Sequence, residues 1–180
     1  TPMNSSAASD VYKRQIESLT PGMAAGAELA FNEASNSGAL LGGSTVSSIR
    51  ADSTCIDSAA AASAAEFLIS QGVTAIMGAD CSGVTGAVLS NVAVPNGVPM
   101  ISPSATSPAL TTAEDNGLFF RTAPSDARGG EVLADITSDR GISSVAITYV
   151  NTDYGVGLAD VYEAAACLLY TSDAADEFMG

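Results

Sequence analysis

Two hydroxyl-rich loops contain the residues best suited to bind a small polar molecule. Residues 78–85 (GADCSGVT) follow the apolar run VTAIM, and residues 102–108 (SPSATSP) follow the run VPMI. A helix that begins at Ser82 offers backbone N–H groups and the positive end of its dipole to an anion such as a carboxylate. The second loop adds the hydroxyl and N–H donors of Thr106, and its carbonyl oxygens can accept hydrogen bonds from an ammonium group.

A carboxylate and an ammonium on one carbon would match this pair of loops. We therefore expect a zwitterion to bind there. The alternative interpretation, that Ser82 only caps its helix and that the Ser-Pro loop only turns the chain, stays open on spacing alone.

Enzymatic and metal sites are disfavoured by the residue types. The chain contains no histidine, so a serine or cysteine nucleophile would lack its usual base, and Cys55 and Cys81 without a histidine do not form a zinc site. Neither common glycine-rich phosphate loop occurs, and Asp80, Asp126 and Asp153 show no paired-carboxylate spacing. We expect no enzymatic activity, no cofactor and no metal.

The elements that must position these loops alternate between helix and strand. Helical spacing of apolar residues predicts helices over residues 21–36, 57–71, 82–92, 125–140 and 157–166. Short apolar runs predict strands over residues 46–51, 73–77, 98–101, 118–121 and 145–150. Pro95 and Gly97 are expected to break the third helix. This order predicts an α/β fold with a parallel sheet and right-handed crossovers, in which ligands lie beyond the carboxyl ends of the strands.

Two short strings near the ends look foreign to any fold. Residues 10–15 (DVYKRQ) can be written GAT GTG TAT AAG AGA CAG, and the reverse complement, shifted by one base, encodes residues 167–172 (CLLYTS). One inverted DNA sequence thus accounts for both strings, and it resembles the transposon-end adapter of sequencing libraries. We therefore expect residues 1–15 and 167–180 to be non-native tails.

The rest of the chain is strongly acidic. Its only basic residues are Arg50, Arg121, Arg128 and Arg140, and the whole chain carries a net charge of −14. Such a charge disfavours nucleic acid and anionic membranes as partners and is typical of a soluble, secreted or salt-adapted protein. No apolar run approaches the roughly 20 residues of a membrane helix.

A set of motifs in a characteristic order covers nearly the whole segment between the tails. The motifs are GAELAFNE at residues 26–33, ADSTC at 51–55, IMGADCSGVT at 76–85, GVPMISPSATSPAL at 97–110, FFRTAPSD at 119–126 and NTDYGVGLA at 151–159. By these motifs the chain resembles type I periplasmic binding proteins of the branched-chain amino acid class. The resemblance implies two α/β lobes that close on a ligand about a hinge.

The resemblance also implies how the chain is divided. Residues 16–122 correspond to an incomplete N-terminal lobe that lacks its first strand. Residues 123–166 correspond to the hinge and the beginning of a C-terminal lobe, most of which is missing.

By resemblance, Ser82 and Thr106 bind the carboxylate of an amino acid, and main-chain oxygens around Ser104 and Ala105 meet its ammonium. Tyr154 would line the pocket from the second lobe, although it could equally be a core aromatic residue. The family's acidic partner of the ammonium comes from later in that lobe and is absent here.

Asp126 is an alternative partner for the ammonium, but an aspartate just after Ser125 is more often a complement to the helix dipole. Arg121 is expected to have a structural role near the hinge. Cys55 and Cys81 each end a passage from strand to loop at the same sheet edge, and some family members have a disulfide at these positions.

The function implied by the resemblance is capture of a branched-chain or similar amino acid for an ABC importer. The protein would be a periplasmic monomer that docks on a membrane permease. Alternatives are a sensory ligand-binding domain of the same fold, a relative that binds urea or short amides, and a doubly wound enzyme, which the absence of histidine disfavours.

Overall fold

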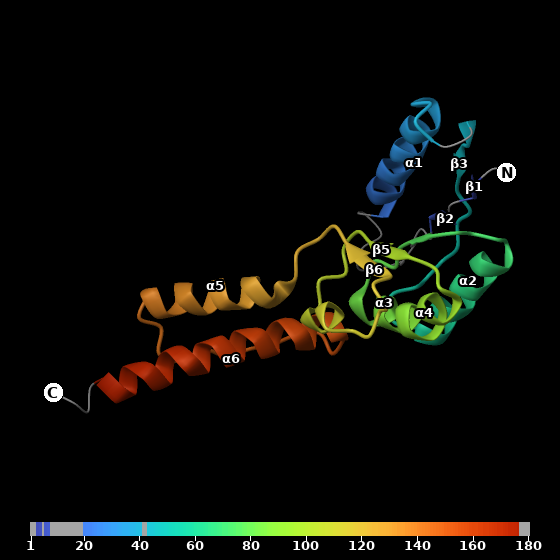
Figure 1. The fold of residues 1–180 in the computed structure, drawn as a ribbon. Helices are drawn as coiled ribbons and strands as arrows, with labels where there is room; N and C mark the ends of the chain where they lie inside the picture. Colours follow the sequence, from blue (N-terminus) through green and yellow to red (C-terminus); the bar gives the residue numbers. More distant parts are fainter. Residues whose placement is uncertain (1–2, 5, 8–19, 41–42, 177–180) are drawn as a thin grey trace. The chain divides into compact units, whose positions relative to one another are not determined.

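The computed structural model describes residues 3–4, 6–7, 20–40 and 43–176 (Figure 1). Residues 10–15, one of the two strings attributed to an adapter, lie outside this part. The chain divides into two compact units. The N-terminal unit comprises the described residues up to Ala105 together with Glu114–Ala123, and the C-terminal unit comprises Thr106–Ala113 and the described residues from Pro124 onward.

The N-terminal unit is built on parallel strands, as predicted. The strand order in its four-stranded sheet is β2 (Ser6–Ala7), β4 (Ile76–Met77), β5 (Met100–Ser102) and β6 (Phe119–Arg121). A separate pair joins β1 (Met3–Asn4) to β3 (Val46–Ser47) in parallel. In β5, Met100 and Ser102 are buried while Ile101 between them is exposed, which is the alternation of a strand with one covered face.

Two short strands near the N-terminus, over residues 3–4 and 6–7, differ from expectation. The sequence predicts a foreign tail there and no strand beside β4. In the structure β1 pairs with β3 and β2 pairs with β4, in parallel in both cases. Pairing of this kind uses backbone N–H and C=O groups, so an extended segment of almost any sequence can fill an open sheet edge.

Most helices of the N-terminal unit bury the faces that their spacing predicted, but in the first helix only Ala27 of the predicted face is buried and Ala30 is exposed. The helices are α1 (Thr20–Asn36), α2 (Ser58–Ser70), α3 (Ser82–Val88), the π-helical turn η2 (Leu89–Ala93) and α4 (Val94–Asn96). Asp57 caps α2, because its carboxylate accepts from the N–H groups of Ala59 and Ala60. Seven residues that their spacing predicted to face inward are buried in the structure: Ala61, Ala65, Leu68, Val84, Val88, Leu89 and Val92. Helix α2 packs against α3 and η2.

The predicted break at Pro95 is wrong. The helical stretch passes through Pro95 and ends at Gly97, whose φ of 64° is the left-handed conformation that favours glycine. The turn before Pro95 is a π-turn, in which the N–H of Val94 donates to the carbonyl of Leu89. A proline has no N–H to donate, and it is tolerated where the regular pattern of hydrogen bonds has already shifted.

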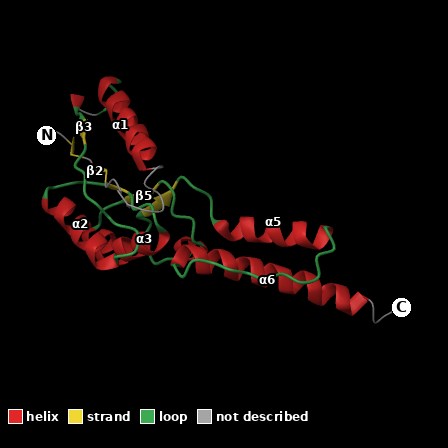
Figure 2. Cartoon of the chain, turned by 180° about the vertical axis from the view of Figure 1, so that it is seen from behind, coloured by secondary structure: helices red, strands yellow, loops and turns green. Residues whose placement is uncertain are grey.

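The C-terminal unit consists of the short 3-10 helix η3 (Pro108–Thr111), α5 (Asp126–Asp139) and α6 (Asp153–Asp176). Figures 1 and 2 show α5 and α6 lying side by side and running in the same direction. Gly130 permits their close approach, since a Cβ built there would lie 2.6 Å from Cγ1 of Val161. The hydroxyls of Thr137 and Tyr162 lie 3.2 Å apart and share a hydrogen bond.

The strand predicted over residues 145–150 (VAITYV) is also wrong. This segment has no regular secondary structure, and its side chains are exposed. Strand hydrogen bonds form between strands, and the described part of the C-terminal unit contains no second strand with which the segment could pair. Helix α6 begins before the predicted Gly157 and continues through residues 167–172, the other string attributed to an adapter.

Candidate functional site

The first predicted loop of the N-terminal unit leads into α3 at Ser82. Cys81 occupies the N-cap position and makes no side-chain hydrogen bond there, so Ser82 is the first helical residue and not the cap. Its side chain is buried. Ser82 is therefore not the N-cap residue, and its hydroxyl lies in the first turn, close to the positive end of the helix dipole.

A buried hydroxyl network joins this loop to the second one. The hydroxyl of Thr85 donates to the carbonyl oxygens of Ala79 and Cys81 at 3.0 and 2.9 Å. The hydroxyl of Ser102 also donates to the oxygen of Ala79, at 2.5 Å, and it accepts from the N–H of Ala105 at 3.0 Å. Both hydroxyl groups are completely buried, so these bonds are shielded from competition with water.

The second loop is held by further bonds to the first. The hydroxyl of Ser104 donates a hydrogen bond to the carbonyl oxygen of Asp80 at 2.8 Å. Ala105 is fully buried, and its carbonyl oxygen accepts from Nη1 of Arg121 at 3.4 Å. The predicted structural role of Arg121 fits this contact. An ammonium at the Ala105 carbonyl would share that oxygen with a guanidinium, which repels a second cation.

The other predicted site residues belong to the C-terminal unit. The carbonyl oxygen of Thr106 accepts from the N–H of Asp126 at 3.0 Å, which fixes the start of α5 beside Thr106. Tyr154 lies in the first turn of α6 and is 45 % exposed, so it is not a core aromatic residue. Gly157 of α6 lies against Ser107 and Pro108 of the same unit. The sequence-predicted residues therefore fall into two groups, with Ser82, Ser104 and Ala105 in one unit and Thr106 and Tyr154 in the other.

The predicted disulfide between Cys55 and Cys81 is confirmed, with a Cα–Cα distance of 5.3 Å. It ties the loop before α2 to the residue that precedes α3. The same loop is therefore held by a covalent bond at Cys81 and by hydrogen bonds at Ala79 and Asp80.

Sequence reasoning missed the two residues that organise these loops, Thr85 and Ser102. Both occur within the quoted motifs, but neither was assigned a role. A detectable signal was present, because each hydroxyl stands among apolar residues that face the core, and a buried hydroxyl requires a hydrogen-bond partner.

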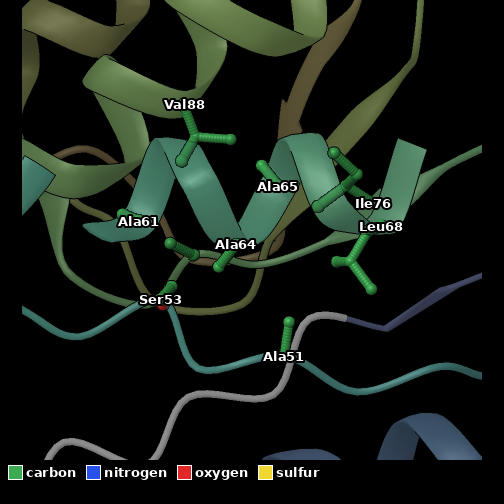
Figure 3. Close-up of a pocket in the computed structure, with 9 residues that line it drawn as sticks. Ala51, Ser53, Ala61, Ala64, Ala65, Leu68, Ile76 and Val88 are labelled. Atoms are coloured by element: carbon green, nitrogen blue, oxygen red, sulfur yellow. The ribbon is translucent and has the colours of Figure 1, made fainter. Parts of the chain in front are cut away.

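An apolar hollow lies elsewhere in the N-terminal unit, between α2 and the sheet (Figure 3). It occupies about 240 Å³, including the solvent at its mouth, and contains none of the predicted site residues. Its lining residues are Ala51, Ser53, Ala61, Ala64, Ala65, Leu68, Ile76, Ala79 and Val88. This lining offers no charged group, so the hollow does not suit the charged end of a zwitterion.

Residues 22–167 match the family model described as the receptor family ligand binding region. The chain belongs to this family. The resemblance to type I periplasmic binding proteins of the branched-chain amino acid class is thereby confirmed, and the α/β fold agrees with that of solved members.

Two curated relatives show the similarity in more detail. The chain is 38 % identical over 106 residues to the Leu/Ile/Val-binding protein homolog 3 of Brucella melitensis, covering 57 % of this chain and 28 % of the relative. It is 34 % identical over 135 residues to BasB, the substrate-binding protein of a chemotactic signal transduction system in Halobacterium salinarum, covering 72 % of this chain and 32 % of the relative.

A solved relative is the ABC transporter substrate-binding protein of Desulfitobacterium hafniense in complex with Leu. It is 26 % identical to this chain, with a TM-score of 0.72, and the match covers 94 % of this chain and 48 % of that one. The chain therefore spans about a third of the length of the curated relatives and about half of the solved chain.

The described residues contain no cluster of three or more histidine, cysteine or acidic residues arranged to hold a metal ion. In the same ranges, no helix combines the length and the apolar character that crossing a membrane requires.

Proposed function

We propose that the chain is part of an extracytoplasmic solute-binding protein that captures a branched-chain or similar amino acid for an ABC importer. The observation that carries the proposal is the pair of loops joined at Ala79, which sets the first turn of α3 beside the loop of Ser104 and Ala105. Family membership and a relative solved with Leu support the same ligand class.

In this proposal, Ser82 and Thr106 bind the carboxylate of the amino acid. The N-terminal turn of a helix attracts an anion, and the buried Ser82 hydroxyl is already fixed in that turn. Ser104 and Ala105 form the neighbouring wall, and Tyr154 contributes its exposed aromatic ring. Binding would be coupled to closure of two lobes about a hinge, as in the family.

The proposal includes a periplasmic location, a membrane permease as the partner, and no enzymatic activity. An importer is preferred to a sensory domain or to a urea-binding or amide-binding relative, because one curated relative is named a Leu/Ile/Val-binding protein homolog and one solved relative is an ABC transporter protein in complex with Leu. The chemotactic relative is itself a substrate-binding protein, so the proposed ligand site would be the same in either system.

Saturation-transfer NMR with the 180-residue chain tests the ligand class. This method detects weak binding, which is the expected range for a chain that spans only part of its relatives. Leucine, isoleucine and valine at millimolar concentration should receive saturation, whereas lysine and urea should not. Ser82→Ala should reduce the leucine signal several-fold, because the variant loses one donor to the carboxylate.

Ser90→Ala is the matched control, since Ser90 lies in the same helical stretch with an exposed hydroxyl that bonds only to the carbonyl of Gly86. This variant should keep the leucine signal. A folded chain that shows no transfer to any of the three amino acids would rule out the proposed ligand class.

A further inference from the structure

The turn that precedes β6 contains an asparagine followed by a glycine. Asn116 and Gly117 have φ angles of 53° and 74°, both in the left-handed region. The N–H of Leu118 donates to the carbonyl oxygen of Asp115 at 2.9 Å, which closes the turn around them. This is the pattern of a type I′ turn, and Asn-Gly is a pair that adopts it readily. The turn therefore favours two residues that can also react with each other.

The side chain of Asn116 is accessible for such a reaction. Asn116 is exposed, and its carboxamide has no hydrogen-bond partner within the described part of the chain. The side-chain carbon Cγ and the backbone nitrogen of Gly117 are separated only by atoms of Asn116 itself, so the two reacting groups are close without any binding event. Glycine has no Cβ that would obstruct the attack.

The backbone nitrogen of Gly117 is held only by a side chain. Its N–H donates to Oδ1 of Asp115 at 2.8 Å, and Oδ2 of the same carboxylate accepts from the N–H of Phe119 at 3.3 Å. Rotation of the Asp115 side chain releases the Gly117 N–H without breaking the backbone hydrogen bond that closes the turn. The nitrogen can therefore lose its proton to solvent while the turn stays formed.

A second Asn-Gly pair in the same unit is held more firmly. The carboxamide of Asn96 donates to the carbonyl oxygen of Val92 at 2.8 Å, and the N–H of Gly97 donates to the carbonyl oxygen of Val94 at 3.1 Å. Both bonds belong to the end of the helical stretch that includes α4. Reaction at Asn96 requires this helix end to open first.

We propose that Asn116 is a site of spontaneous deamidation and of isoaspartate formation. The Gly117 nitrogen loses its proton to water and forms a bond to Cγ of Asn116, and the side-chain nitrogen leaves as ammonia. Water then opens the resulting succinimide ring. Cleavage of the new Cγ–N bond gives aspartate, and cleavage of the original peptide bond gives isoaspartate, in which the main chain runs through Cγ. Overall, the amide and one water molecule become a carboxylate and an ammonium ion.

The test is incubation of the purified chain in H₂¹⁸O at mildly alkaline pH, where the backbone nitrogen loses its proton more readily. Each event adds one ¹⁸O atom at the converted residue. Digestion with pepsin in acid separates the two Asn-Gly pairs, and mass spectrometry measures the conversion at each. Asn116 should convert about tenfold faster than Asn96, because reaction at Asn96 must first break two hydrogen bonds. Both aspartate and isoaspartate should form at position 116.

The unfolded chain is the matched control. In guanidinium chloride both asparagines precede a glycine in an open chain, so their rates should agree within about twofold. Equal rates at the two positions in the folded chain, faster conversion at Asn96, or no conversion at Asn116 would overturn the inference. Conversion of Asn116 to aspartate alone would also overturn it, since direct hydrolysis of the side-chain amide forms no ring and gives no isoaspartate.

Discussion

The hydroxyl of Ser102 donates a 2.5 Å hydrogen bond to the carbonyl oxygen of Ala79, 23 residues earlier in the chain. Thr85 donates to the same oxygen from the opposite end of the first loop. Two side chains from separate elements thus converge on one backbone carbonyl. The two loops that we propose to bind ligand are therefore held in place before any ligand binds. Binding then causes a smaller loss of conformational entropy.

Ser102→Ala should destabilise the chain by about 2–3 kcal/mol, because the variant removes the bond to Ala79 and leaves the buried N–H of Ala105 without its partner. Urea unfolding followed by circular dichroism measures the difference. The control is Ser90→Ala, which removes an exposed hydroxyl and should change the free energy of unfolding by less than about 0.5 kcal/mol. Equal effects of the two substitutions would contradict the role given to Ser102.

Thr85→Val combined with Ser102→Ala should cost more than the sum of the single variants. Each single variant leaves the Ala79 carbonyl one donor, whereas the double variant leaves it neither of the two. We expect a coupling free energy of about 1 kcal/mol in a double-mutant cycle. Strict additivity would show that the two hydroxyls do not act on a shared acceptor.

Reduction of the disulfide between Cys55 and Cys81 should lower the free energy of unfolding by about 3–4 kcal/mol. The bond closes a loop with a sequence separation of 26 residues, and the estimate follows from the entropy that such a closure removes from the unfolded chain. Urea midpoints with and without dithiothreitol provide the measurement. Cys167→Ser is the control, because Cys167 is exposed and is not part of the disulfide, and the midpoint of this variant should match that of the wild type in both conditions.

Two adjacent glycines of α5 should respond in opposite directions to alanine. Gly130→Ala places a Cβ against Val161 and Tyr162 of α6 and should destabilise the chain by about 1–3 kcal/mol through overpacking. Gly129→Ala meets nothing within 4 Å and should stabilise the chain by roughly 0.5–1 kcal/mol, because alanine is the better helix former. Thermal unfolding of both variants checks the pair, and a stabilised Gly130→Ala would show that α5 and α6 do not pack this closely.

Salt should stabilise this protein. Its net charge is −14, so negative side chains repel one another in the compact folded state, and added ions screen that repulsion. Raising sodium chloride from 0.05 to 0.5 M should increase the free energy of unfolding by about 1 kcal/mol, with little further gain at 1 M because the screening length is then only about 3 Å. A stability that falls with salt, or that rises steadily without levelling off, would contradict screening as the cause.

The α/β class, the parallel sheet, the disulfide and the positions of most helices could be predicted from the sequence. These features depend on short-range patterns such as the spacing of Ala61, Ala65 and Leu68, which forms one buried helical face. Most of the predicted strands were found for the same reason, since a short apolar run between helices has few other ways to bury its side chains.

Two features could not be predicted without the tertiary structure: whether residues 145–150 form a strand, and which groups hold the two loops together. A strand forms only where a neighbouring strand is available to exchange hydrogen bonds with it. The sequence of the segment does not show whether such a neighbour is present. Likewise, the contact of Ser102 with Ala79 is not a property of any local segment. It results from long-range packing, which places hydrogen-bond donors and acceptors that are distant in the chain within about 3 Å of each other.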